Sequence, residues 1–308
     1  MADAAHPEPR RHHYVPRCWL AGFTDTGEKE GRLFVTDFKR RNQWGAVPGT
    51  AGFIRDFYRL EGEHVDDPVL AEKSLSQIED AIAPLLRSMD RDKRGPTKEE
   101  LESVLYFIAI QWSRVPAFRP FVLSLFDKIS YEKISEMLES PESLRRALAD
   151  AGMDPDAPGA EYRRMKRFHD DKAYKLTAPT DWYVLEAFKA VENILPGLKK
   201  RYWATLISPS GGFIASDNPV ILDGKKGEIV GFENAEVISF AVSRHVALWG
   251  TLKPEKRPFI NRKFIASVNT LSLLYAEEQV FSHVLDFCWL DENRKYQTDW
   301  TLFSKDKY

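Results

Sequence analysis

The chain has 308 residues, of which 43% are hydrophobic, 12% aromatic and 29% charged. This profile is typical of a folded globular protein and excludes a disordered or low-complexity chain, because apolar content this high can offset the entropy lost on folding. Forty-four Lys and Arg against 46 Asp and Glu give a formal charge of −2. No overall field therefore favours nucleic acid or an anionic membrane, and any polyanion site must be a local patch.

Cysteine usage and the first residues indicate the compartment. Cys18 and Cys288 are too few for a disulfide scaffold and lack the spacing of a zinc site. The basic run of residues 10–13 lies where a secretory signal needs apolar residues. No run approaches the roughly 20 apolar residues that span a bilayer. We therefore expect a cytoplasmic protein with reduced thiols and no membrane association.

The first part of the chain is expected to contain a polar tail, short strands and then helices. Asp67-Pro68 starts the first long helix, which Pro84 is expected to kink. A capping box, Thr97 to Glu100, starts the second. The tail is predicted at 1–11, a strand at 33–35, a short ordered stretch at 53–58, and later helices at 121–138, 143–151, 161–175 and 181–194.

Strands dominate the last third of the chain. They are predicted at 202–207, 220–222, 237–242, 246–249 and 284–290, with a helix at 262–276 and residues 213–215 pairing back on 202–207 as a hairpin. The expected fold class is α+β: a central helical block with a mostly antiparallel sheet formed by N-terminal and C-terminal strands. We expect one domain, 12–308, with a helical subdomain at about 66–197 and a β-rich part at about 200–300.

Two polar features stand out before residue 100. Adjacent histidines on an extended segment face opposite ways, so only one, His13, is expected to enter a site, with Tyr14 and Arg17 beside it. The competing interpretation is a polar N-terminal arm. Glu79 lies at the border of the apolar face of its helix, about 80° from the centre. Such a carboxylate either lines a cleft or covers hydrophobic surface.

Two further features lie in the rest of the chain. Gln111 and Arg114 share one side of an apolar helix and need partners, which an ion pair within the fold or an anionic substrate would supply. Asp217 and Asn218 follow a predicted strand, and Pro219 makes Asn218 extended. They form either an oxygen-ligand or hydrogen-bonding corner, or an Asx turn that closes a hairpin.

Four of these motifs together resemble the domain of unknown function 4238. The motifs are His13-Tyr14-Val15-Pro16 with Leu20 and Phe23, Ile78-Glu79, Gln111-x-x-Arg114-x-Pro116, and Ser216-Asp217-x-Pro219. A later Pro-Leu-Ser strand of the family reads Ala241-Val242-Ser243 here. The resemblance implies no established activity. It implies a bacterial setting, with some members in gene neighbourhoods linked to defence against phage, which favours a nucleic acid or nucleotide as partner.

The functional hypothesis is a metal-assisted phosphodiester hydrolase. There is no Walker loop, GxGxxG, GxSxG or HExxH sequence. Their absence argues against an ATP-driven protein, a dinucleotide-dependent enzyme, an α/β-hydrolase and a zincin. His13, Glu79 and Asp217 would be catalytic, with His13 and Asp217 holding Mg²⁺ or Mn²⁺. The expected substrate-binding residues are Tyr14, Arg17, Gln111, Arg114 and Asn218. The alternatives are a non-catalytic ligand- or partner-binding module with a buried polar network, and a purely structural role for every motif.

Overall fold

The structure is a computed structural model that describes residues 10–61, 65–225, 227, 230–254 and 260–308. Its α-helices are α1 (Arg17–Leu20), α2 (Leu70–Asp92), α3 (Lys98–Ser113), α4 (Phe118–Met137), α5 (Pro141–Asp150), α6 (Tyr162–Asp170), α7 (Thr180–Lys199) and α8 (Arg262–Tyr275). Its strands are β1 (Arg11–His13), β2 (Leu33–Asp37), β3 (Asn42–Ala46), β4 (Phe53–Arg55), β5 (Tyr202–Ile207), β6 (Ala215–Ser216), β7 (Ile221–Asp223), β8 (Val237–Ala241), β9 (Val246–Thr251), β10 (Gln279–Ser282), β11 (Trp289–Leu290) and β12 (Tyr296–Gln297).

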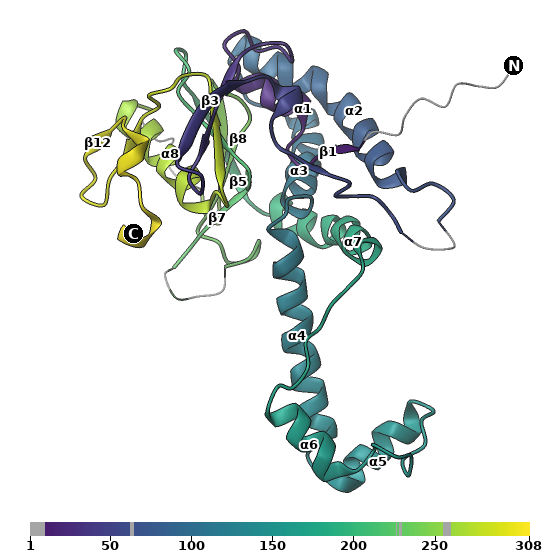
Figure 1. The fold of residues 1–308 in the computed structure, drawn as a ribbon. Coiled ribbons are helices and arrows are strands. Elements are labelled where there is room, and N and C mark those ends of the chain that lie inside the picture. Colours follow the sequence, from purple (N-terminus) through teal and green to yellow (C-terminus); the bar gives the residue numbers. More distant parts are fainter. Residues whose placement is uncertain (1–9, 62–64, 226, 228–229, 255–259) are drawn as a thin grey trace, which may run out of the picture.

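Two four-stranded antiparallel sheets form the β part of the body. One has the order β3-β2-β10-β6 and the other β5-β9-β8-β7. The first joins strands from the two ends of the chain, so the α+β prediction with such a sheet is confirmed. In Figure 1 the sheets lie between α8 on one side and α1, α2 and α3 on the other. Trp19 packs α1 against β8 of the second sheet, because it stacks on Phe240 and donates to the carbonyl of Ala241.

Two predicted strand pairings are wrong. Residues 213–215 do not return on β5, because the loop after β5 crosses to the other sheet, where β6 pairs with β10. Of residues 284–290, predicted to close the sheet, only Trp289–Leu290 form a strand, β11, which pairs with β12 in a separate two-stranded sheet. The C-terminal strand of the larger sheet is β10, at Gln279–Ser282. The hydroxyl of Ser282 donates to the carbonyl of Val284 and closes a turn where the predicted strand was expected to begin.

The N-terminal boundary also differs from the prediction. Arg11 belongs to β1 and pairs with Arg55 of β4, and Arg10 forms an ion pair with Asp56. The ordered body therefore includes Arg10 and Arg11. The other nine residues of the predicted tail lie outside the described residues.

The helices of the body follow their sequence signals. Thr97 and Glu100 form the predicted capping box of α3. α2 continues through Pro84 to Asp92 as a single helix. α3 is buried along most of its length and packs against α2 and α7, which places its last turn deep in the body.

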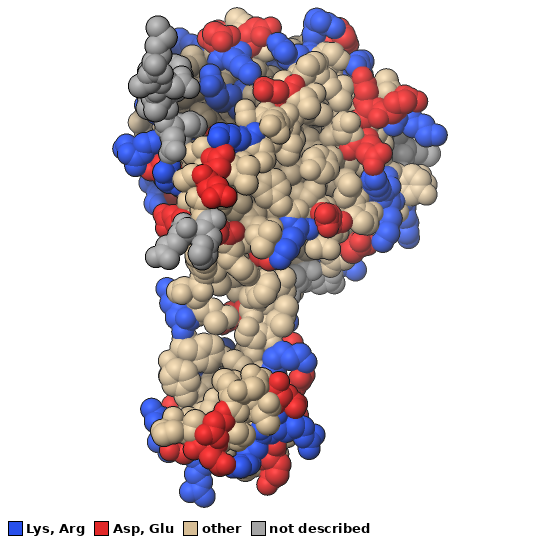
Figure 2. All heavy atoms as spheres, turned by 90° about the vertical axis from the view of Figure 1, so that its right-hand side faces the viewer, with Lys and Arg blue, Asp and Glu red and all other residues tan. Residues whose placement is uncertain are grey.

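A helical arm leaves this body. α4 extends away from it and carries α5 and α6 at its far end (Figure 1). In the perpendicular view the arm is a narrow column ending in a lobe covered with charges of both signs (Figure 2). The lobe has a small core of its own, formed by Leu138, Leu144 and Leu148. None of the described helices is both long and apolar enough to cross a membrane.

Replacing Asn269 of α8 with Ala is expected to destabilise the body. This side chain is fully buried; its Oδ1 accepts from the N–H of Ile214, and its Nδ2 donates to the carbonyls of Gly212 and Cys288. Leaving these backbone groups unpaired should lower the free energy of unfolding by roughly 2–4 kcal/mol, measured by urea denaturation. Asn193→Ala, on the exposed side of α7, is the control; equal effects of the two substitutions would contradict this role.

Candidate functional site

The segment from β1 to α1 lies between two cavities. His12 is fully buried, and its Nδ1 accepts a 2.8 Å hydrogen bond from the N–H of Tyr58. His13 lines a cavity of about 530 Å³, whereas Tyr14 lines a different one of about 990 Å³. We call these the His13 cavity and the Tyr14 cavity. Of the two adjacent histidines, His13 lines one of these cavities and His12 lines neither.

The His13 cavity brings together three of the predicted site residues. His13, Arg17 and Glu79 line it, with Glu72 one further carboxylate along α2. Its remaining lining residues are Arg10, Arg11, Lys29, Gly49, Ser76 and Asp80. Basic and acidic side chains therefore share one hollow, which suits a ligand that carries negative charge and undergoes proton transfer.

His13 and Glu72 are the perturbed groups of this cavity. Burial, and after it the positive charges of Arg17 and Arg114, lower the pKa of His13 to about 4. Burial raises the pKa of Glu72 to about 7, against the effects of the Arg114 charge and of the backbone N–H of His13, which both act to lower it. At pH 6 the imidazole is therefore neutral and most of the carboxyl is protonated.

Each of these two groups also has an unsatisfied atom. His13 Nε2 and Glu72 Oε2 are buried, and neither has a hydrogen-bond partner among the described residues. A buried polar atom without a partner costs about 1–3 kcal/mol, and such atoms need an explanation such as a catalytic role or a bound group. Here the two atoms belong to residues that line the same cavity.

Arg114 contacts two of the residues that line this cavity, Glu79 and His13. It is buried, its Nη1 lies 2.8 Å from Oε1 of Glu79, and its Nη2 donates to the carbonyl of His13. Burial alone would lower the pKa of Arg114, but Glu79 raises it. The hydroxyl of Tyr58 donates to the Arg114 carbonyl at 2.5 Å. Of the two partners predicted for Arg114, the structure shows the ion pair within the fold.

Gln111 lies one turn before Arg114 and is fully buried. Neither its Oε1 nor its Nε2 has a hydrogen-bond partner among the described residues. It is absent from the lining of both the His13 cavity and the Tyr14 cavity. The predicted contact between Gln111 and a substrate is therefore not seen in either of them.

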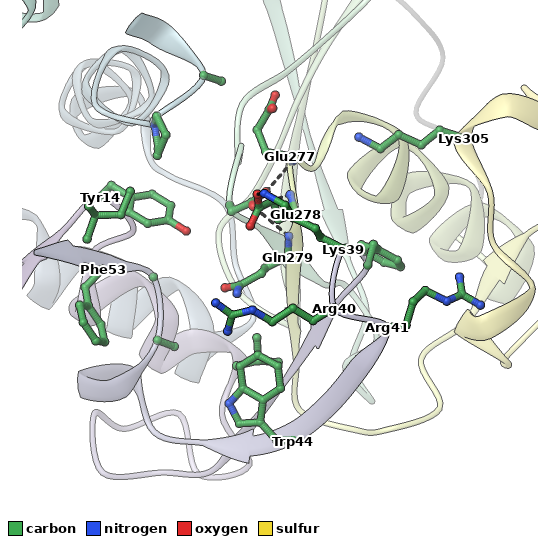
Figure 3. Close-up of a pocket in the computed structure, with 18 of the residues that line it drawn as sticks. Tyr14, Lys39, Arg40, Arg41, Trp44, Phe53, Glu277, Glu278, Gln279 and Lys305 are labelled. Atoms are coloured by element: carbon green, nitrogen blue, oxygen red, sulfur yellow. Dashed lines mark hydrogen bonds and ion pairs between the residues drawn. The ribbon is translucent and has the colours of Figure 1, made fainter. Parts of the chain in front are cut away.

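Asp217 lines the Tyr14 cavity. Its carboxylate accepts three backbone N–H bonds of 2.7–2.8 Å, from Glu277, Glu278 and Gln279 at the start of β10. Burial raises the pKa of Asp217 to about 6, while the three N–H bonds act to lower it. The hydroxyl of Tyr14 points toward this turn (Figure 3).

Asn218 also has a partner within the fold. Its Nδ2 donates to the carbonyl of Tyr275, and the Ser216 hydroxyl donates to the carbonyl of Asn218. The Ser-Asp-Asn-Pro corner thus fixes the connection between α8 and β10 and does not close a hairpin of its own. Of the arrangements expected from the sequence, these contacts correspond to a hydrogen-bonding corner at the end of a strand.

Cations and aromatic rings complete the Tyr14 cavity. Lys39 pairs with Glu278 at 2.5 Å, and Lys305 donates to the carbonyl of Ala276. Arg40 and Trp44 lie next to each other at its edge (Figure 3). This composition suits an anionic ligand that also offers a flat ring.

The predicted constellation is thus divided between two cavities. His13, Arg17 and Glu79 line one, and Tyr14 and Asp217 line the other. His13 and Asp217, predicted to share a metal ion, do not line a common cavity. No group of three or more His, Cys, Asp and Glu side chains in the described part of the chain is placed to hold a metal.

Sequence reasoning missed Glu72, although a signal was present. Glu72 precedes Glu79 by seven residues, which is two turns of α2, so both carboxylates lie on one face. The cationic and aromatic residues of the Tyr14 cavity gave no comparable signal, because they come from separate loops that only the sheet β3-β2-β10-β6 brings together.

Comparison with known proteins identifies the family. The family model "Protein of unknown function (DUF4238)" matches residues 11–284. The chain belongs to this family, as its four motifs indicated. No curated protein and no solved structure matches the chain.

Arg114→Ala is expected to lower the free energy of unfolding by about 3 kcal/mol, because it leaves Glu79 without its cation and the His13 carbonyl without its donor. Thermal and urea unfolding measure the loss. Arg17→Ala, an exposed arginine of the same cavity, is the control and should change stability by less than about 0.5 kcal/mol. A melting temperature of Arg114→Ala equal to that of the wild type would show that the ion pair is not structural.

Gln111→Met is expected to stabilise the protein. Methionine has a similar shape and removes two buried polar atoms that lack partners, so the gain should be about 1 kcal/mol. Differential scanning calorimetry of the two proteins measures it, with Gln297→Met as an exchange of the same residues on a partly exposed strand. A lower melting temperature for Gln111→Met would mean that the amide is satisfied in solution.

Proposed function

We propose that the protein is a phosphodiester hydrolase, with the His13 cavity as its active site and nucleic acid or nucleotide as its substrate class. The observation that carries the proposal is the pair of unsatisfied atoms, His13 Nε2 and Glu72 Oε2, on two residues of one cavity that basic residues also line. Their pKa values are shifted so that one group is a free base while the other still carries a proton.

In the proposed reaction His13 is the general base and Glu72 the general acid. Nε2 takes a proton from a water molecule as its oxygen attacks phosphorus. The bond from phosphorus to the leaving oxygen breaks, and the Glu72 carboxyl gives its proton to that oxygen. The negative charge of the substrate offsets the repulsion from Arg17 and Arg114, so the basicity of His13 rises when substrate binds.

Three cations of the cavity are available for the phosphate. Arg17 and Lys29 form no hydrogen bond or ion pair with any other described residue, and Arg11 only covers the ring of Phe53. Arginine binds phosphate through two parallel N–H donors. Glu79 is committed to Arg114, so its role in this proposal is to position the arginine and not to react.

Binding of a divalent ion by His13 Nε2 and Glu72 Oε2, the two buried atoms without hydrogen-bond partners, would compete with this acid–base reaction, because a metal ligand cannot also take or hold a proton. Both Mg²⁺ and Mn²⁺ therefore belong in the assay, next to EDTA. We place the activity in the bacterial cytoplasm and in defence against phage. The bacterial setting and the defence role are supported by the family resemblance, and the cytoplasmic location by the sparse cysteine usage.

The wild-type enzyme should hydrolyse bis(p-nitrophenyl) phosphate and single-stranded DNA or RNA. Its kcat/KM should rise with pH through about 4, as His13 loses its proton, and fall through about 7, as Glu72 loses its own. Glu72→Gln should remove the alkaline fall together with most of the activity. His13→Ala should lower kcat/KM by at least about 100-fold.

The same measurements separate failure of the proposal from failure of the protein. Arg146→Ala, on the exposed side of α5, is the control and should keep full activity. The proposal fails if folded wild-type protein is inert on every substrate with Mg²⁺, Mn²⁺ and EDTA. It also fails if His13→Ala retains the activity.

The second candidate is a ligand-binding module without turnover. The observation that favours it is the Tyr14 cavity, where aromatic and cationic side chains surround a corner locked by Asp217. Binding of a nucleotide that depends on Trp44, with no product formed by wild type or His13→Ala, would support this candidate over the hydrolase.

A further inference from the structure

A third cavity lies against the C-terminal half of α2. Its volume is about 490 Å³, and Asp90, His245, Arg87, Arg244 and Lys93 are among its lining residues. We call it the His245 cavity. None of the motifs singled out in the sequence covers these residues.

The centre of the His245 cavity is a built Asp–His pair. Nδ1 of His245 lies 2.9 Å from Oδ1 of Asp90, and both side chains are largely buried. Burial opposes the ionisation of Asp90, but hydrogen bonds from His245 and Ser243 hold its pKa below the ordinary value. The carboxylate therefore keeps the proton on Nδ1, and Nε2, which has no partner among the described residues, is left for a ligand.

Cations surround this pair. Arg87 is exposed and pairs with no other described residue, whereas Arg244 is held in place by the carbonyl of Thr24. Lys93 donates to the carbonyl of Pro209. A free and a fixed guanidinium next to an oriented imidazole are groups that bind a phosphate.

The His245 cavity adjoins the His13 cavity along one ridge of α2. Residues spaced by four, Glu72, Ser76, Asp80, Pro84 and Ser88, follow this ridge; the first three line the His13 cavity and the last two the His245 cavity. One loop also contributes to both cavities, because Glu28 lines the His245 cavity and Lys29 lines the His13 cavity. From Glu79 to Arg87 the helix rises about 12 Å, which is about three to four nucleotides of a stacked strand.

We infer that the His245 cavity binds a backbone phosphate of the strand whose scissile phosphate lies in the His13 cavity. The inference rests on the proposed function and narrows its substrate: a single-stranded nucleic acid of several nucleotides, held along α2, and not a mononucleotide.

The test compares binding of labelled single strands by fluorescence anisotropy, without divalent metal and at a pH where cleavage is slow. A strand of about ten nucleotides should bind at least tenfold more tightly than a dinucleotide. Arg87→Ala and His245→Gln should each weaken binding of the long strand about tenfold and leave the dinucleotide unchanged. For Arg87→Ala the slope of log affinity against log salt should fall by about 0.7.

Arg146→Ala, which removes the same charge from the arm, is the matched control and should change neither affinity. Binding of the long strand that depends on Arg87, without any cleavage, would support a phosphate site in the His245 cavity but overturn the hydrolase and, with it, a scissile phosphate in the His13 cavity. Cleavage of bis(p-nitrophenyl) phosphate through His13, with long and short strands bound equally or with no effect of Arg87→Ala, would overturn the inference and keep the hydrolase. No binding of either strand would overturn it as well.

Discussion

The buried guanidinium of Arg114 connects three separate parts of the chain. It pairs with Glu79 of α2 and donates to the carbonyl of His13, the last residue of β1. Arg114 itself lies at the end of α3, where its backbone carbonyl accepts from the Tyr58 hydroxyl. A charge removed from water this completely is tolerated only when its partners are fixed. The position of the N-terminal segment relative to α2 therefore follows from this contact, and with it the shape of the His13 cavity.

The alternation of side chains along an extended backbone determines which cavity each residue of the N-terminal segment lines. Successive side chains of such a segment point in opposite directions, so His12, His13 and Tyr14 reach the interior, the His13 cavity and the Tyr14 cavity in turn. One short segment thus separates two hollows of different chemistry. The smaller has groups suited to proton transfer, and the larger has rings and cations around the Asp217 corner.

Local sequence signals predicted the helices and singled out individual polar residues. They could not predict which strands or side chains far apart in the sequence pair with each other. The capping box at Thr97 and the apolar spacing of α2 depend on neighbours in the sequence, and both predictions are confirmed. The partner of Arg114 lies 35 residues away and that of Asp217 about 60, and no pattern in one sequence specifies such pairs. For the same reason the sequence marked His13 and Asp217 but could not show that they line different cavities, and it assigned residues 213–215 to the wrong sheet.

The arm of α4, α5 and α6 has a consequence for how the molecule opens. Its lobe is held by three buried leucines and a few partly buried neighbours, whereas the body has a large continuous core. Local stability follows the amount of buried apolar contact, so amide protons of α5 and α6 should exchange with solvent through openings that leave the body folded. The largely exposed connection between these helices, residues 151–161, should therefore be readily cleaved by a protease and should tolerate an inserted sequence.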